Sequence, residues 1–303
     1  MKNLFLIIVS IFVKLFSIVS NVLNLLSINL VYLKEKNNIF CTFLNLRNFF
    51  IKKKIVNNVE IKIATSSWWD LHRINFFKDY AVKDIFFDKK FKKEIVFLEI
   101  GANTGIASLL IAKKFNKSTV YSIEFEPNSY LTLSQNIYLN NLSNIIPLCF
   151  GLAKKSDHKK FYYNLNYKSL KKYNTIQSGA GGHSITFDKN AHHKNYFFKS
   201  VFTNYDKLSK TLNLKTPSHV FIDAHGGEKE IISGMINTLT KKNMYKVYVD
   251  TEEHKNFKNL WVYKKLNKLG FKLTNYETSY FGTNSSSTSL IFKKNFKQKN
   301  FQI

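Results

Sequence analysis

The sequence predicts an α/β fold in which helices cover both faces of a mainly parallel, seven-stranded sheet. From residue 92 onward, short apolar runs alternate with segments of helical pattern, and strands that are joined through helices run parallel. A glycine turn at residues 101–105 joins the first apolar run to the first helical segment. The last two apolar runs have no helical segment between them, so we expect an antiparallel pair at that end of the sheet.

Three parts of the chain are expected to differ in role. Residues 1–33 form a hydrophobic segment, residues 34–91 lead into the main domain, and residues 92–296 make up that domain. In the lead-in part, we expect a short strand at 61–63. A helix rich in Phe and Lys should follow the tryptophan pair at 68–69, which itself fits a core position.

The hydrophobic segment is expected to be an amphipathic helix. Five of its polar residues, from position 10 to position 24, are spaced three or four apart, which puts them on one side of a helix. The first alanine of the chain is Ala64, so the segment lacks the small-residue cleavage site of a secretory signal. Such a helix suits a membrane interface, but also suits packing on the protein's own core or on a partner subunit. We expect it to hold a cytoplasmic protein on the membrane surface.

The main domain is expected to contain seven strands and four helices. The strands are expected at 95–100, 119–125, 144–150, 220–222, 245–249, 271–273 and 289–292. The helices are expected at 105–115, 128–141, 227–239 and 256–269. Asn128 is the expected N-cap of the second helix, and Gly270 should end the fourth.

The composition excludes several classes of protein. Of the 303 residues, 45% are hydrophobic, too many for a disordered chain. Cys41 and Cys149 cannot build a disulfide framework or a cysteine zinc site, and they fit a reducing compartment. The paired histidines His192 and His193 have no carboxylate at ligand spacing, so no metal is expected.

The charge is strongly basic. Subtracting 20 acidic residues from 46 basic ones leaves +26, which is typical of partners such as nucleic acid or an anionic membrane. Nearly all of this charge is lysine, however, and Asn, Ile and Phe, which share A/T-rich codons with lysine, are abundant too. Lysine is also spread through the chain rather than gathered in one arm, so nucleic acid is not the expected partner.

The strongest signal for a ligand is the turn that follows the first strand of the main domain. Gly101 permits a tight turn, and Gly105 permits close approach of a ligand or a helix. A dinucleotide site needs G-x-G-x-x-G, but Asn103 occupies the place of the middle glycine. Glu99, just before the turn, suits the cationic amino-acid end of S-adenosylmethionine better than it suits a pyrophosphate.

A second acid supports the same cofactor. Glu126 lies 25 residues after Gly101, at the end of the next strand, where a carboxylate can accept hydrogen bonds from both ribose hydroxyls. The residues expected to bind S-adenosylmethionine are Glu99, Gly101, Ala102, Asn103, Thr104, Gly105, Glu126, Pro127 and Asn128.

These motifs resemble those of the FkbM family of methyltransferases. The resemblance covers roughly residues 96–292 and is carried by the segments 97–105, 125–128, 136 with 140–142, 221–228 and 232–234. It implies a class I methyltransferase fold, S-adenosylmethionine as cofactor, and transfer of a methyl group to a hydroxyl of a glycan, a sugar or a small metabolite. Two positions differ from the family's usual Lys-Ile-Asp-Val-Glu-Gly at the fourth strand, because Phe221 replaces the lysine and His225 replaces the glutamate.

Asp223 and His225 are the candidate catalytic residues. The protein must align the acceptor oxygen with the methyl group, and a base can take the proton of the hydroxyl. The imidazole of His225, with an ordinary pKa of ~6.5, suits that task, but His225 also fits a loop position with no catalytic part. Asp223 suits the same task or the positioning of substrate or metal. Weaker candidates for acceptor binding are the glycine-rich segment 178–184 and the acids Asp250, Glu252 and Glu253, which equally suit turns in solvent.

Two rival functions stay open. Ribose methylation of a nucleic acid is one, although the isolated prolines at 127, 147 and 217 do not form the Asn/Asp-Pro-Pro motif of base N-methylation. A membrane-associated protein that binds S-adenosylmethionine without catalysis is the other, and the changes at Phe221 and His225 favour it. Glu99 and Glu126 argue against it, since a degenerate site need not keep both.

Overall fold

The computed structural model describes eight stretches of the chain, all within one compact unit, Arg47–Ile303. These stretches are residues 50–56, 58–65, 80–88, 94–162, 197–224, 226–251, 257–281 and 285–294. The predicted hydrophobic helix at 1–33 lies outside them, as do Trp68 and Trp69, the segment 178–184, the pair His192 and His193, and the residues His225, Glu252 and Glu253. In the described stretches, no helix combines the length and the apolar character that crossing a bilayer requires.

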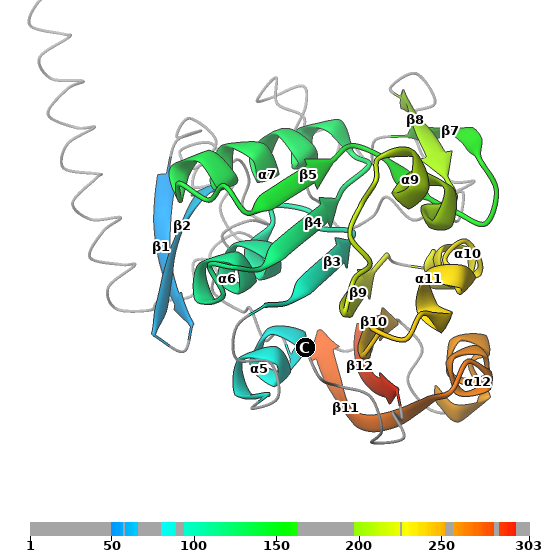
Figure 1. Cartoon of the computed structure of the whole chain (residues 1–303). Coiled ribbons are helices and arrows are strands. Elements are labelled where there is room, and N and C mark those ends of the chain that lie inside the picture. Colours follow the sequence, from blue (N-terminus) through cyan, green and yellow to red (C-terminus); the bar gives the residue numbers. More distant parts are fainter. Residues whose placement is uncertain are drawn as a thin grey trace, which may run out of the picture. The chain divides into compact units, whose positions relative to one another are not determined.

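A seven-stranded sheet forms the centre of the fold, as the sequence predicts (Figure 1). Its order is β11-β12-β10-β9-β3-β4-β5, and only β12 runs antiparallel to its neighbours. The strands are β3 (Val96–Ile100), β4 (Thr119–Ile123), β5 (Ile145–Leu148), β9 (His219–Asp223), β10 (Lys246–Thr251), β11 (Phe271–Phe281) and β12 (Ser285–Lys294). The last two are much longer than predicted, because their pairing continues beyond the apolar runs as far as Phe281 and Ser285.

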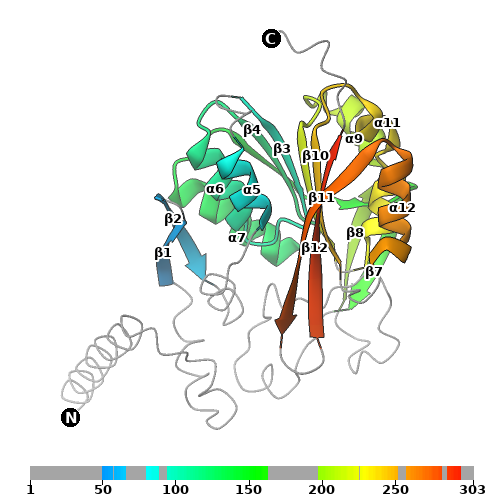
Figure 2. The same ribbon diagram turned by 90° about the horizontal axis from the view of Figure 1, so that it is seen from below.

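Helices cover both faces of this sheet (Figure 2). On one side, α5 (Tyr80–Phe87) and α6 (Ile106–Lys114) cover a core that includes Phe97, Phe221 and Tyr248. A second core on the other side includes Leu98, Ile222 and Val249. The helices there are α9 (Tyr205–Thr211), α10 (Glu228–Ser233), α11 (Ile236–Thr240) and α12 (Trp261–Lys268), with the short helix η1 (Phe257–Asn259) before α12. Residues that alternate along a strand therefore enter different cores.

Three helices depart from the prediction, and the one expected at 256–269 is divided into η1 and α12. The helix expected at 128–141 is α7 (Pro127–Leu139), and its N-cap is Glu126 rather than Asn128, because Pro127 suits the first helical position. The Glu126 carboxylate accepts from two amides of the first turn. The helix expected at 227–239 is broken into α10 and α11 at Gly234. A Cβ on Gly234 would lie 2.3 Å from the carbonyl oxygen of Ala153, so the chain packs too closely there for an ordinary helical residue.

A second, smaller sheet follows β5 in the chain. It contains β6 (Gly151–Leu152), β7 (Asp157–Tyr162) and β8 (Phe197–Thr203) in the order β6-β8-β7. The sequence analysis did not predict this sheet.

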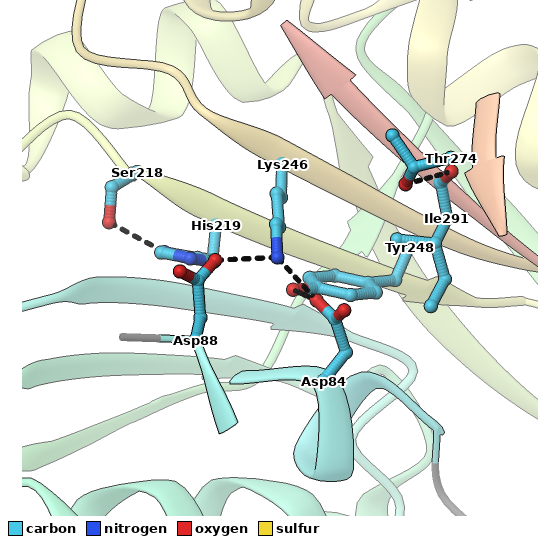
Figure 3. Close-up of polar contacts among 8 residues, drawn as sticks. All are labelled: Asp84, Asp88, Ser218, His219, Lys246, Tyr248, Thr274 and Ile291. Carbon is cyan, nitrogen blue, oxygen red and sulfur yellow. Dashed lines mark hydrogen bonds and ion pairs between the residues drawn. The ribbon is translucent and has the colours of Figure 1, made fainter. Parts of the chain in front are cut away.

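The lead-in part contributes a hairpin and the helix α5. The hairpin consists of β1 (Phe50–Val56) and β2 (Val59–Thr65), and β2 includes the strand predicted at 61–63. An ion pair holds α5 against the amino end of β10, where Lys246 Nζ lies 2.6 Å from Asp84 and 2.6 Å from Asp88 (Figure 3). Burial opposes the charge on Lys246, but the hydrogen bonds to Asp84 and Asp88 raise its pKa above the usual range.

A buried histidine lies beside this ion pair. His219 is fully buried at the start of β9, with Ser218 Oγ 2.9 Å from its Nδ1 (Figure 3). Burial, followed by the nearby charge of Lys246, lowers the pKa of His219 to about 3, while Asp88 acts in the opposite direction. This cluster lies at the amino ends of β9 and β10, away from the strand ends at which ligands bind in such folds.

Candidate functional site

The order of the strands places the candidate site between the carboxyl ends of β3 and β9. From β3 the chain proceeds to β4 and β5 on one side of the sheet, while β9 and β10 lie on the other. Such a reversal opens a crevice outside the carboxyl ends of the two strands, where α/β proteins bind their ligands. The predicted turn follows β3 and Asp223 ends β9, so the structure brings them together at this point.

The contact between Gly101 and Asp223 is close. Gly101 has φ +82°, and a Cβ added to it would lie 2.0 Å from the carbonyl oxygen of Asp223. Only glycine satisfies both the left-handed conformation and the lack of space.

The rest of the turn is held against the end of β4. The backbone amides of Gly101 and Ala102 both donate to the carbonyl of Ile123, at 2.9 and 3.0 Å. Asn103 has φ 51°, and its amide donates to Glu124 Oε2 at 2.8 Å. The turn therefore has a fixed shape before any ligand binds.

Glu99 points from β3 toward the first turn of α6. Its side chain is buried, and Oε2 accepts from the Ser108 amide at 3.0 Å and also from the Ser108 hydroxyl. The Ser108 hydroxyl lies 2.6 Å from that of Ser122 on β4. Because α6 has no side-chain N-cap of its own, Glu99 also serves to satisfy the amino end of this helix.

Two further carboxylates lie at the end of β4. Glu124 accepts from the amides of Asn103 and Glu126, both at 2.8 Å. Glu126 accepts from the amides of Asn128 at 3.1 Å and Ser129 at 2.6 Å. Both are buried, so backbone dipoles rather than water stabilise their charges. Partial desolvation raises the pKa of the exposed Cys149 thiol, and the charges of Glu124 and Glu126 raise it further.

These residues fit S-adenosylmethionine. The side-chain oxygen Asn103 Oδ1 is buried, and no described residue donates a hydrogen bond to it, so it is an acceptor ready for an N–H or O–H group of a ligand. Three buried carboxylates close to one turn favour a cationic ligand and oppose a pyrophosphate. The assignment of the ribose contact to Glu126 stays a prediction.

Asp223 belongs to a polar row that crosses the carboxyl edge of the sheet. It pairs in register with Asp250 of β10, which pairs with Ser289 of β12. Register partners on adjacent strands point to the same face, and Ser289 donates a hydrogen bond to Asp250. Asp223 and Asp250 are both half-buried, so an acceptor molecule beside the turn would meet two carboxylates. The other catalytic candidate, His225, lies outside the described residues.

The sequence analysis missed two residues that shape the site. Glu124 directly follows β4, two residues before Glu126, and the sequence analysis does not single it out. Asn136, on α7, donates from Nδ2 to the carbonyl of Thr104 at 2.9 Å. It was known only as part of a family motif, since a buried amide inside a helix carries no sequence signal for its partner.

Comparison with known proteins gives a family match. The model of the Methyltransferase FkbM domain matches residues 99–273, which is more than half of the chain. Methyltransferase 1 of Beauveria bassiana (strain ARSEF 2860) is 25% identical over 169 residues, covering 52% of this chain and 67% of that protein.

Two solved structures are more distant. The precorrin-6y C5,15-methyltransferase from Geobacter metallireducens GS-15 has a TM-score of 0.41 and 12% identity, covering 71% of this chain and 87% of that one. TYW2 of M. jannaschii, in complex with AdoMet, has a TM-score of 0.39 and 15% identity, covering 82% and 88%. Similarity at this distance carries no argument about function.

Proposed function

This chain belongs to the FkbM methyltransferase family, and from that premise we propose that it transfers a methyl group to a hydroxyl oxygen of a glycan, a sugar or a small metabolite. Its methyl donor is S-adenosylmethionine. The family that the sequence motifs predicted is confirmed. The observation that carries the proposal is the close contact of Gly101 with the end of β9, which sets Asp223 directly beside the cofactor turn.

The residues of the turn would hold the cofactor. When bound, S-adenosylmethionine supplies an electrophilic methyl group on a sulfonium centre. We assign Asn103 Oδ1 the role of accepting a hydrogen bond from it, and Glu126 the role of accepting from its ribose. The buried charge of Glu99 favours the cationic amino-acid end through space, since its own hydrogen bonds go to Ser108.

The acceptor would lie against the row of Asp223 and Asp250. Methyl transfer needs the acceptor oxygen in line with the methyl group, and alignment alone contributes a large part of the rate. In this proposal Asp223 accepts the proton of the hydroxyl, while Asp250, held by Ser289, accepts a hydrogen bond from a second hydroxyl of the acceptor. Two carboxylate acceptors suit a molecule with several hydroxyl groups, such as a sugar.

Labelling tests this proposal. The full chain is incubated with methyl-labelled S-adenosylmethionine and, separately, with polysaccharide, lipid-linked sugar, small-metabolite and RNA fractions. We expect label on an ether oxygen of a carbohydrate or metabolite, stable to mild base. An Asp223→Asn variant should lose about 100-fold or more in turnover and keep its affinity for S-adenosylhomocysteine.

The same experiment separates the rivals. The charge of +26 favours RNA as a second candidate acceptor, and label on ribose would overturn the proposal in favour of that reading. Binding of S-adenosylhomocysteine without label in any fraction would favour a protein that binds the cofactor without catalysis.

We also propose a location. Residues 1–33 would hold the enzyme on the cytoplasmic face of a membrane, in the compartment that makes its donor. Lys34, Lys36 and the run 52–54 would add positive charge near anionic lipid. The support is the long apolar segment with its single polar stripe.

A further inference from the structure

We propose that Asn136 is a positioning residue that couples strand β2 of the lead-in hairpin to the cofactor turn, and that this coupling sets the affinity for S-adenosylmethionine. The inference rests on the proposed function, because it assigns the turn to the cofactor. It gives the lead-in part of the chain a role in binding.

The side chain of Asn136 uses both ends of its amide. Its Oδ1 accepts from the backbone amide of Ala64 on β2 at 2.7 Å, and its Nδ2 donates to the carbonyl of Thr104 at 2.9 Å. Asn136 is completely buried, and Thr104 nearly so. Loss of either bond would leave a backbone group without a partner in a place that water does not reach.

The bond to Thr104 acts on one peptide unit of the turn. The carbonyl of Thr104 and the amide of Gly105 belong to the same peptide plane, and that amide donates to the carbonyl of Ala102 at 2.8 Å. The plane is thus fixed at both ends. It joins Thr104 to Gly105, whose φ is +84°, and glycine permits the plane to rotate once a bond is lost. Rotation of this plane would break the bond from Gly105 to Ala102, which closes the turn around Asn103. The Oδ1 of Asn103, the acceptor offered to the cofactor, would then lose its fixed position.

Asn140 provides a matched control. At the C-cap of α7, four residues further along the chain, it holds the same strand through Lys62, accepting from the amide at 2.8 Å and donating to the carbonyl at 2.6 Å. Its remaining bond goes to the carbonyl of Asn136, and no hydrogen bond within the described residues joins it to the turn. Asn140 therefore attaches β2 to the end of α7 through the same kinds of bond, nearer the surface and without reaching the cofactor site.

The test compares Asn136→Asp with Asn140→Asp in the full chain. Each change keeps the size and the acceptor oxygen of the side chain, and each removes the N–H donor. Calorimetry with S-adenosylhomocysteine at about pH 8 should show a Kd roughly tenfold higher for Asn136→Asp, and within about twofold of the parent for Asn140→Asp. Lowering the pH should reduce the difference in Kd between Asn136→Asp and the parent. Burial raises the pKa of the introduced carboxyl, and its protonated form can donate to Thr104 again.

Hydrogen exchange of the ligand-free proteins decides the coupling independently of cofactor binding. The amides of residues 103–105 should exchange faster in Asn136→Asp, and at the parent rate in Asn140→Asp. The proposal is wrong if the two substitutions change the exchange rates and the Kd equally. It is also wrong if Asn136→Asp folds and keeps the exchange rates and the Kd of the parent. If Asn136→Asp does not fold, the milder Asn136→Ser decides by the same two measurements. If the two variants show the expected exchange rates but the parent binds no S-adenosylhomocysteine, the proposed function is contradicted and the coupling stands.

Discussion

Substitution of Gly101 by alanine tests how the turn and the end of β9 fit together. The added methyl group would lie 2.0 Å from the carbonyl oxygen of Asp223, whereas real Cβ contacts are essentially never shorter than 3.0 Å. The two backbones must therefore separate by at least about 1 Å, since neither contact atom is the end of a flexible side chain. A displacement of that size in a catalytic arrangement costs about 100-fold in rate.

The same chain offers a control for backbone strain. Gly270 has φ +86°, almost the value of Gly101, and no described atom lies within 4 Å of its Cβ position. Alanine at either position should lose about 1–2 kcal/mol of folding free energy from the left-handed conformation, which lowers Tm by about 2–8 °C. Only Gly101→Ala should lose turnover about 100-fold and bind S-adenosylhomocysteine at least tenfold more weakly.

The assay combines thermal unfolding, calorimetry with S-adenosylhomocysteine, and methyl transfer on the three proteins. If Gly101→Ala binds and turns over as Gly270→Ala does, the crevice between β3 and β9 is not the cofactor site.

Three further predictions concern other parts of the chain. Glu126→Ala should raise the Kd for S-adenosylhomocysteine at least tenfold and lower stability by about 0.5–2 kcal/mol through loss of the α7 cap; calorimetry and urea unfolding measure both, and unchanged affinity would move the ribose contact elsewhere. The pKa of His219 is lowered to about 3 on folding, so below about pH 6.5 the unfolded chain binds the extra proton. Stability should then fall by up to about 1.4 kcal/mol per pH unit as acid is added; urea unfolding between pH 7 and 5 should show a flatter dependence in His219→Gln, and equal slopes would refute the assignment. Deletion of residues 1–33 should move the protein from the membrane pellet to the soluble fraction with its Tm unchanged; a full-length protein that is already soluble, together with unfolding on truncation, would show that the segment is core.

Much of the central sheet was predictable from the sequence, because each buried strand is a short apolar run between turn residues. The run around Leu98 is buried on both faces, and a continuous apolar stretch is typical of such a strand. The turn at Gly101 was predictable for a similar reason, since a left-handed residue beside another backbone requires glycine.

The missed features depend on contacts between distant residues. Gly234 breaks a predicted helix because Ala153 packs against it, and nothing near Gly234 in the sequence records that neighbour. The cap at Glu126 is an exception, because it depends on its neighbour Pro127, which occupies the first position of α7. The partners of Glu99 and Asn136 likewise come from other elements, so the sequence could identify these side chains but not the direction in which they point.

Calorimetric titration of the full-length parent with S-adenosylhomocysteine, beside an identical titration with NAD, tests the central claim most directly. The buried carboxylates around the turn and the acceptor at Asn103 predict saturable binding of one S-adenosylhomocysteine per chain, and no measurable heat with NAD. Binding of NAD, or no binding of S-adenosylhomocysteine by the folded chain, would contradict the account.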